Sequence, residues 1–472
     1  MFFGLFKKKP APTVRRHFDV ICLNTSCMEA FDHSQRLFRL NPPDDVASYH
    51  RSKYIGGDLE DSADPAQPDD MYAAIPSLEP SKSPNPAFLD DSRLKEMEDY
   101  YYGGNDEPRC VTIESIPAHA GRGRARRLYY KDDPGTGFVS SIYDEYGNRS
   151  NIPVCPYCHA ELYVGAGIAQ TKIVPVLGVT QSGKSVMFEM GLDRFMRESV
   201  KMMLPQGAAY QNAEGKEYLS KLAESLKSRN TVEATNQVKR LMWNIDSDSR
   251  SILFITFDMP GEYIGNSMDA SNKKFREKDL ANVLFKADGL IIVISPEQLE
   301  SIVENSGMRS ISDMIQLVCN ESDPARVLHS KNVPAVVLLT KLDKLKPTYK
   351  GKLSLRHLDH GLKEEIMKIL DLEEYSPSES FVDMGALGNI SGITEQLFRR
   401  LFMNEINMIS TTLLGNANRA GCFAASIQGS DDSAEENAAP IRPFDSFYWL
   451  FAKMGIFRVK PTAVSASRRR LP

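Results

Sequence analysis

From Lys172 onward the chain alternates short apolar runs with longer amphipathic stretches, and this alternation constrains the fold more than any other feature. The runs at 289–295 and 333–339 are rich in β-branched residues and far shorter than the roughly 20 residues that cross a bilayer, so they suit strands buried on both faces. Strands that alternate with helices predict an α/β fold with a mostly parallel sheet and helices on both faces. The expected strands are residues 173–177, 252–257, 290–294, 335–339 and 422–425, and residues 444–454 are expected to form the last covering helix.

The composition is typical of a soluble globular protein with more than one domain. Of 472 residues, 42% are hydrophobic and 25% are charged, and the net charge is −5. This balance gives no strong signal for nucleic acid, although the run 121–127 (Gly-Arg-Gly-Arg-Ala-Arg-Arg) is either a phosphate or nucleic-acid patch or a solvated loop. Residues 1–9 lack the order of a signal peptide, so they are either a simple tail or a weak peripheral contact with an anionic membrane.

Seven cysteines in a chain without an export signal favour reduced thiols or a metal site, so a cytoplasmic location is expected. Cys155-Pro-Tyr-Cys158-His is a tight knuckle suited to tetrahedral Zn²⁺. A second pair, Cys22 and Cys27, would complete four thiolates and close a structural zinc site. The alternative is free thiols, since the first pair is spaced more widely. Residues 40–150 would then be a long irregular insertion in a split zinc-ribbon-like region.

The segment 178–185, Gly-Val-Thr-Gln-Ser-Gly-Lys-Ser, fits the phosphate-binding pattern G-x-x-x-x-G-K-[ST] and follows an expected strand. Glycines let backbone N–H groups converge on a polyphosphate, and the helix that begins near Lys184 adds the positive end of its dipole. Lys184 is expected to reach the β- and γ-phosphates, and the Ser185 hydroxyl to ligate Mg²⁺. One irregularity is Pro175, which removes a backbone donor from the preceding strand. The nucleotide-binding residues expected in the loop are Gly178, Gln181, Ser182, Gly183, Lys184, Ser185 and Val186.

A D-x-x-G motif follows at the end of the strand 252–257. The carboxylate of Asp258 suits the Mg²⁺ shell, and the Gly261 N–H suits contact with a γ-phosphate that a side chain would block. The motif is common by itself, and its position after the phosphate-binding loop makes it informative.

Thr340-Lys341-Leu-Asp343 directly follows the strand 335–339. The Asp343 carboxylate can accept hydrogen bonds from guanine N1–H and N2–H₂, a donor pair that adenine lacks, while the stem of Lys341 can lie over the purine. These residues therefore indicate GTP rather than ATP, unless they belong to an ordinary solvated turn.

These motifs and their spacing resemble the TRAFAC class of P-loop GTPases, which implies a P-loop NTPase (G-domain) fold. The class has a switch-I threonine, for which Thr235, our preference, and Thr231 compete. Its last base-contacting loop matches either residues 381–388 or residues 422–429. We favour the second, which places Ser426 and Ile427 at the base, because it is the cleaner small apolar strand and a closing helix follows it.

Glu262 stands where many members of the class carry a glutamine that orients the attacking water. A carboxylate beside the γ-phosphate costs electrostatic repulsion unless a cation screens it. We therefore expect slow intrinsic hydrolysis that a partner stimulates by supplying an arginine.

A narrower resemblance is to the bacterial double-GTPase families. It rests on residues 142–147 (Ile-Tyr-Asp-Glu-Tyr-Gly), the knuckle 155–159, the phosphate-binding loop, the serine loop 426–429, and residues 441–443 (Ile-Arg-Pro) followed by 448–450 (Tyr-Trp-Leu). These families are predicted switches of prokaryotic conflict or defence-type systems in which GTPases act together. The resemblance implies a protein partner, either another GTPase or an activating protein.

The expected organisation is a basic and apolar tail at 1–16, the split zinc-ribbon-like region at 17–165, a GTPase domain at 166–457 and a polar basic tail at 458–472. We predict a Mg²⁺-dependent switch that binds and hydrolyses GTP. Lys184, Thr235 and Glu262 would be catalytic, and Ser185, Thr235 and Asp258 would hold Mg²⁺. The alternatives are a GTP-bound scaffold that does not hydrolyse and an ATP-driven P-loop regulator.

Overall fold

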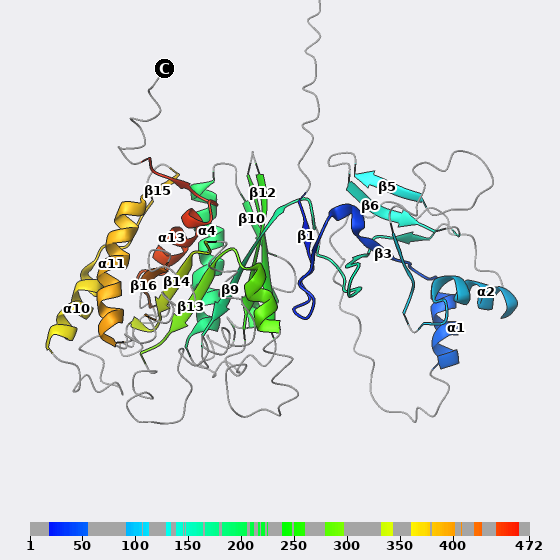
Figure 1. The fold of residues 1–472 in the computed structure, drawn as a ribbon, viewed down its shortest axis with the longest axis horizontal. Coiled ribbons are helices and arrows are strands. Elements are labelled where there is room, and N and C mark those ends of the chain that lie inside the picture. Colours follow the sequence, from blue (N-terminus) through cyan, green and yellow to red (C-terminus); the bar gives the residue numbers. More distant parts are fainter. Residues whose placement is uncertain are drawn as a thin grey trace, which may run out of the picture. The chain divides into compact units, whose positions relative to one another are not determined.

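The chain divides into two compact units, residues 1–168 and 169–472, and each has its own apolar core (Figure 1). Within the part of the chain described, no helix is both long and apolar enough to span a membrane. The computed structural model describes residues 18–54, 91–105, 107–112, 129–133, 138–144, 146, 148–163, 166–178, 182–204, 208–211, 216–217, 219–221, 224, 238–247, 250–259, 279–296, 332–342, 360–377, 380–401, 407, 420–426 and 440–461.

The second unit is built on a seven-stranded sheet in the order β10-β11-β12-β9-β13-β14-β16. The strands at one edge, β10 (Ala208–Gln211) and β11 (Lys239–Ser247), are antiparallel to their neighbours. The prediction of a mostly parallel sheet is confirmed, because the five expected strands are all present and parallel. They are β9 (Gln170–Leu177), β12 (Arg250–Asp258), β13 (Leu290–Ile294), β14 (Ala335–Leu339) and β16 (Ala420–Ala424).

Burial explains why the central strands give a stronger sequence signal than the edge strand pair. Every residue of β13 and β14 is buried, so both faces are covered and the sequence reads as an unbroken apolar run. In β11, by contrast, Leu241, Trp243 and Ile245 are buried between more exposed neighbours. This alternation is the pattern of a half-buried strand, and it was the available signal for β11.

Pro175 lies in β9 without removing a hydrogen bond from the ladder to β12. The Ile173 carbonyl accepts from the amides of Asp288 and Gly289 at 2.8 and 3.3 Å, so Ile173 directs its backbone groups toward β13. Backbone direction repeats every second residue, so Pro175 also faces β13. The register with β13 begins only at Val176. The proline nitrogen therefore faces β13 just before the hydrogen-bonded register begins. No donor is needed there, so a proline is tolerated in this central strand.

A helical run leaves the loop that starts at Gly178 through α3 (Lys184–Val186), a π-helical turn η2 (Met187–Leu192) and α4 (Asp193–Met203). Phe195 of α4 packs against three rings of α13 (Asp445–Lys453), with centroid distances between 5.1 and 5.3 Å. The prediction of a closing helix at 444–454 is thus confirmed. This aromatic contact joins α4 and α13 to the same apolar core as one face of the sheet.

Two further helices, α10 (His360–Asp371) and α11 (Met384–Leu401), lie beside each other toward the β16 end of the sheet (Figure 1). Ser391 of α11 accepts a hydrogen bond from the Cys422 amide at 2.9 Å, which fixes α11 on β16. A separate parallel pair is formed by β15 (Phe381–Val382) and β17 (Arg458–Val459).

The described residues of the first unit form three small sheets with the orders β1-β2, β4-β3-β8 and β5-β6-β7. Its helices are η1 (His33–Gln35), α1 (Asp44–Tyr54) and α2 (Asp91–Tyr101). The strands are β1 (Val20–Ile21), β2 (Ala30–Phe31), β3 (Leu37–Arg39), β4 (Cys110–Thr112), β5 (Tyr129–Asp133), β6 (Phe138–Tyr143), β7 (Arg149–Ser150) and β8 (Pro153–Val154).

The prediction that residues 40–150 form an irregular insertion is wrong for the part of this range that the structure describes. Its described parts hold α1, α2 and four strands, with Val46, Met97, Tyr101 and Ile142 buried in one cluster. Each element is short, so none gives a long apolar run in the sequence. The buried Tyr101 hydroxyl also donates a hydrogen bond to Asp144, a contact that no apolar pattern indicates. Periodicity over so few residues is a weak signal, so a small ordered module looked irregular in the sequence.

Candidate functional site

The loop between β9 and α3 is folded tightly against the carboxyl end of β13. A Cβ atom on Gly178 would lie 2.7 Å from Ser182 Oγ and 2.8 Å from the Val293 carbonyl oxygen, so any side chain there would force the loop away. Gly183 has a φ of 84°, in the left-handed region that glycine favours. Both glycines of the motif are therefore required by the conformation itself. Val179, Thr180 and Gln181 between them lie outside the described residues.

Lys184 begins α3 and turns back over the loop. Its Nζ donates to the Gly178 carbonyl at 2.7 Å, and the residue is only 7% exposed. Burial lowers the pKa of Lys184, while the negative charge of nearby Asp258 raises it. A buried ammonium that is easier to deprotonate than usual marks a site that would gain from further negative charge.

Asp258 and Thr340 bring two more strands to the same place. Asp258 ends β12 and is fully buried. Thr340 follows β14, where its hydroxyl donates to the Ser182 carbonyl at 2.6 Å and lies 3.2 Å from the Ile294 carbonyl oxygen. A Cβ on Gly183 would lie 3.3 Å from the Thr340 hydroxyl. Thr340, which the sequence predicts at the base, therefore also holds the loop that starts at Gly178.

The ends of β14 and β16 are joined just beyond the sheet. The Ala425 amide donates to the Leu339 carbonyl at 2.8 Å, and the Leu342 amide donates to the Ala425 carbonyl at 3.2 Å. Between them Lys341 adopts a positive φ of 53°, so the backbone turns sharply at this point. Ser426 is buried and exchanges two backbone hydrogen bonds with Ile441, at 3.0 and 2.7 Å.

The choice of residues 422–429 over 381–388 for the last strand and loop agrees with the sheet. β16 is hydrogen-bonded to β14, whereas β15 pairs only with β17, away from the main sheet. Any contact of Ser426 with a base remains a prediction.

The sheet topology points to the same edge by an independent route. Numbered along the chain, the five parallel strands stand in the spatial order 2-1-3-4-5, and the direction of winding reverses between β9 and β13. Ligands of open α/β sheets bind outside the carboxyl ends of the strands at such a reversal. Gly178 and Lys184 stand at this point.

The structure thus brings part of the predicted constellation to one edge of the sheet. The described members are Gly178, Ser182, Gly183, Lys184, Ser185, Val186, Asp258, Thr340, Lys341 and Ser426. The predicted residues that lie outside the described part of the chain are Gln181, Thr231, Thr235, Gly261, Glu262, Asp343 and Ile427.

The first unit gathers four cysteines from opposite ends of its sequence. Cys22, Cys27, Cys155 and Cys158 place their sulfur atoms within 4.8 Å of one another, although none forms a disulfide. Four thiolates at about 2.3 Å from a tetrahedral Zn²⁺ would be about 3.8 Å apart. The Sγ atoms of Cys22 and Cys158 are 3.6 Å apart, and those of Cys27 and Cys155 are 3.9 Å apart. The cluster can therefore bind a metal such as zinc, as the spacing of the two pairs predicted.

The two pairs sit on hairpins that repeat one another. The Cys22 amide donates to the Glu29 carbonyl and the Cys155 amide to the Ala160 carbonyl, both at 2.9 Å, so each pair is closed by a similar backbone contact. Residues of positive φ, Met28 and His159, follow each second cysteine. The wider spacing of the first pair therefore does not prevent convergence, because its hairpin is closed in the same way.

The thiols strongly influence one another. Burial raises the pKa of Cys22 far above its usual range and that of Cys27 to about 11. Burial also acts to raise the pKa of Cys158, but hydrogen bonds from the Ala160 amide and from the other thiols lower it overall. Several thiolates in so small a space repel each other unless a cation lies between them.

Arg442 has a structural role that sequence reasoning missed. Its buried guanidinium forms an ion pair with Asp445 and donates to the carbonyls of Leu372 and Glu373, both at 3.0 Å. The side chain thereby ties the end of α10 to the start of α13. The adjacent proline and the buried aromatic helix were the only local signals for this role.

No protein-family model matches the chain, and no curated protein matches it significantly.

Proposed function

We propose that the second unit binds GTP with Mg²⁺ and hydrolyses it as a molecular switch, with slow turnover that a protein partner accelerates. The observation that carries the proposal is the convergence of Lys184, Asp258 and Thr340 on the loop that starts at Gly178, at the carboxyl edge of the sheet. A parallel sheet that reverses its winding at this point supports the same location.

The phosphate end of the proposed site rests on described residues. Lys184 supplies a buried positive charge, and α3 begins at the loop, where the first N–H groups of a helix favour an anion. The Ser185 hydroxyl and the Asp258 carboxylate, with Thr235, would hold Mg²⁺. That ion, when bound, would neutralise charge on the β- and γ-phosphates.

Preference for guanine rests on the sequence motif that follows β14. Thr340 and Lys341 follow the end of β14, and β13 lies between β14 and β9 in the sheet. A carboxylate at Asp343 would pair with two guanine N–H groups, and an adenine would leave it unsatisfied. This chemistry favours GTP over the alternative of an ATP-driven regulator.

Binding is tested by titrating the purified full chain with a fluorescent GTP analogue in the presence of Mg²⁺, with unlabelled GTP and ATP as competitors. GTP should displace the probe and ATP should not. Lys184→Ala should abolish binding, and Asp343→Asn should shift the preference away from guanine. Lys172→Ala is the matched control, because Lys172 belongs to β9 and pairs with Asp288 at 3.1 Å, far from the loop. Absence of any uptake of guanine nucleotide would end the proposal.

Hydrolysis is tested separately by single-turnover measurements of bound GTP. A slow rate that rises with an arginine-supplying partner supports the switch. Rapid turnover by the protein alone would contradict the need for a partner, and no turnover under any condition would favour the scaffold.

We also propose that the four cysteines hold a structural Zn²⁺. Such an ion would stabilise all the thiolates at once and join the two ends of the first unit. Metal analysis should find one zinc per chain, and Cys155→Ser should lose it. Cys110→Ser is the control, because Cys110 lies in β4 outside the cluster. Full zinc content in the Cys155 variant would contradict the assignment.

A further inference from the structure

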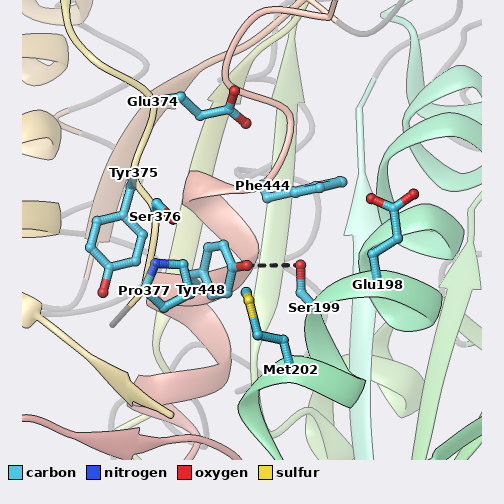
Figure 2. A pocket seen from close by; sticks show the side chains of 9 residues that line it. All are labelled: Glu198, Ser199, Met202, Glu374, Tyr375, Ser376, Pro377, Phe444 and Tyr448. Atoms are coloured by element: carbon cyan, nitrogen blue, oxygen red, sulfur yellow. Dashed lines mark hydrogen bonds between the residues drawn. The ribbon is translucent and has the colours of Figure 1, made fainter. Parts of the chain in front are cut away.

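A cavity of about 370 Å³ opens between α4, the start of α13 and the segment that follows α10 (Figure 2). It is separate from the proposed nucleotide site, because Ser199 in its wall is 15 residues along the helical run from Lys184, or about 22 Å at 1.5 Å per residue. The volume suits one side chain or a small molecule. The lining residues are Glu198, Ser199, Met202, Glu374, Tyr375, Ser376, Pro377, Phe444 and Tyr448.

The aromatic walls are fixed before anything binds. Tyr448 is 3% exposed, and its hydroxyl donates to Ser199 Oγ at 2.8 Å (Figure 2). The Tyr375 amide donates to Asp445 at 3.2 Å, and its hydroxyl accepts from the Asp383 amide at 2.7 Å. The two tyrosine rings meet edge to face at 5.4 Å. A ligand would therefore find ring faces already held in place, which lowers the entropic cost of binding.

The charges of the cavity select a cation. Figure 2 shows the carboxylates of Glu198 and Glu374 toward one end, with Met202 and Pro377 toward the other. Burial and nearby Asp445 raise the pKa of Glu374 overall, although Arg442 and Arg194 act to lower it, so a further positive charge beside Glu374 would be favourable. Arg194 pairs with Glu198 at 2.9 Å and lies 5.7 Å from the centre of the Phe444 ring, so an incoming guanidinium would displace it. The Arg194–Glu198 pair is exposed and therefore weak enough to rearrange. Carboxylates above aromatic rings recognise a guanidinium through ion pairing and cation–π attraction.

The C-terminal end of the described chain contacts the residue that holds Tyr375 in the cavity wall. The Lys460 amide donates to the Val382 carbonyl at 2.9 Å, and Lys460 Nζ lies 3.4 Å from the Asp383 carboxylate. The Asp383 amide in turn holds Tyr375 in the cavity wall. Residues 461–467 connect this point to Arg468-Arg-Arg470 and can span up to about 25 Å. The three arginines are therefore within reach of the cavity.

We infer that the cavity formed by Glu198, Glu374, Tyr375 and Tyr448 receives an arginine side chain of Arg468–Arg470 from the same chain. The aliphatic stem of the arginine would pass along Met202 and Pro377, and its guanidinium would meet the carboxylates. The contact anchors the C-terminal segment to the junction of α4, α10 and α13. It does not depend on nucleotide binding.

The inference is tested with full-length protein in which Arg468, Arg469 and Arg470 are all replaced by alanine. A fluorescently labelled peptide of residues 461–472 should bind this variant at least tenfold more tightly than the unaltered chain, whose own segment competes at high effective concentration. Adding Glu374→Gln should weaken binding about fivefold, since it removes one ion pair and the field over the rings. Higher salt should weaken it further.

Glu364→Gln is the matched control, because Glu364 is an exposed carboxylate of α10 outside the cavity; it should leave peptide binding unchanged. Equal binding to the triple variant and the unaltered chain would overturn the inference, as would equal effects of the Glu364 and Glu374 substitutions. A peptide of residues 121–127 that binds as tightly as residues 461–472 would show that the cavity does not select the C-terminal arginines.

Discussion

Gly178 is the position where the smallest chemical change should have the largest effect. Alanine there would place a methyl group 2.7 Å from Ser182 Oγ and 2.8 Å from a backbone carbonyl, and the carbonyl cannot rotate away. We expect Gly178→Ala to abolish GTP binding and to lower the free energy of unfolding of the second unit by more than 1 kcal/mol, in the range of overpacking. Nucleotide titration and urea unfolding would measure the two effects.

Gly388→Ala is the control for that substitution. Gly388 lies within α11, and a Cβ there meets no atom within 4 Å. Since alanine is the better helix former, this variant should gain up to about 1 kcal/mol and bind nucleotide normally. Unchanged nucleotide binding by Gly178→Ala would refute the tight-loop interpretation.

Sequence motifs predict individual residues of the candidate site where the chemistry requires a local pattern. Gly178 and Lys184 belong to the same eight-residue motif, so their contact follows from the conformation of this loop. The hydrogen bond from Thr340 to Ser182 joins residues 158 positions apart, and no local pattern specifies it. Arg442 was noticed only within a resemblance, because its partners on α10 become neighbours through folding.

At the scale of an element, α11 depends on a single carboxylate at its start. Asp383 accepts hydrogen bonds from the amides of Gly385 and Ala386 at 2.9 and 3.1 Å, as an N-cap residue does. The bond from the Ala386 amide is the main reason that the pKa of Asp383 is below its usual value. We expect Asp383→Ala to cost about 1 kcal/mol of stability at pH 7.

The pH dependence of this loss has a definite sign. Because the folded-state pKa of Asp383 is depressed, its contribution is fully present above the unfolded pKa of about 3.9 and disappears as the pH falls through the lower folded value. Urea unfolding of the unaltered chain and Asp383→Ala should differ at pH 7 and converge near pH 2. A difference that persists undiminished in acid would contradict the capping role.

The longer the run of consecutive buried apolar residues in an element, the more accurately the sequence predicts that element. The strands β13 and β14 are buried on both faces, and their predicted bounds match. In α2, Leu94, Met97 and Tyr101 give only one brief helical stripe, so the element was missed. Tertiary pairing rather than local pattern determines β10, which has only four residues at the sheet edge.

At the scale of the whole molecule, two units with separate cores should unfold separately. Chelation of zinc should lower only the transition of the first unit, since the cysteines belong to residues 18–163. GTP at 100 times its dissociation constant should stabilise only the second, by about 2.7 kcal/mol. Calorimetry with each addition alone would measure this. A single transition that responds to both would show that the units unfold together.

The hydroxyl of Thr340 contacts the loop that starts at Gly178, while its own backbone leads into the motif that we propose to recognise the purine. The phosphates and the purine of one bound nucleotide would therefore both act on Thr340. A nucleoside alone and pyrophosphate alone would each order the same atoms around Thr340. The affinity of neither fragment would therefore predict the affinity of the complete nucleotide.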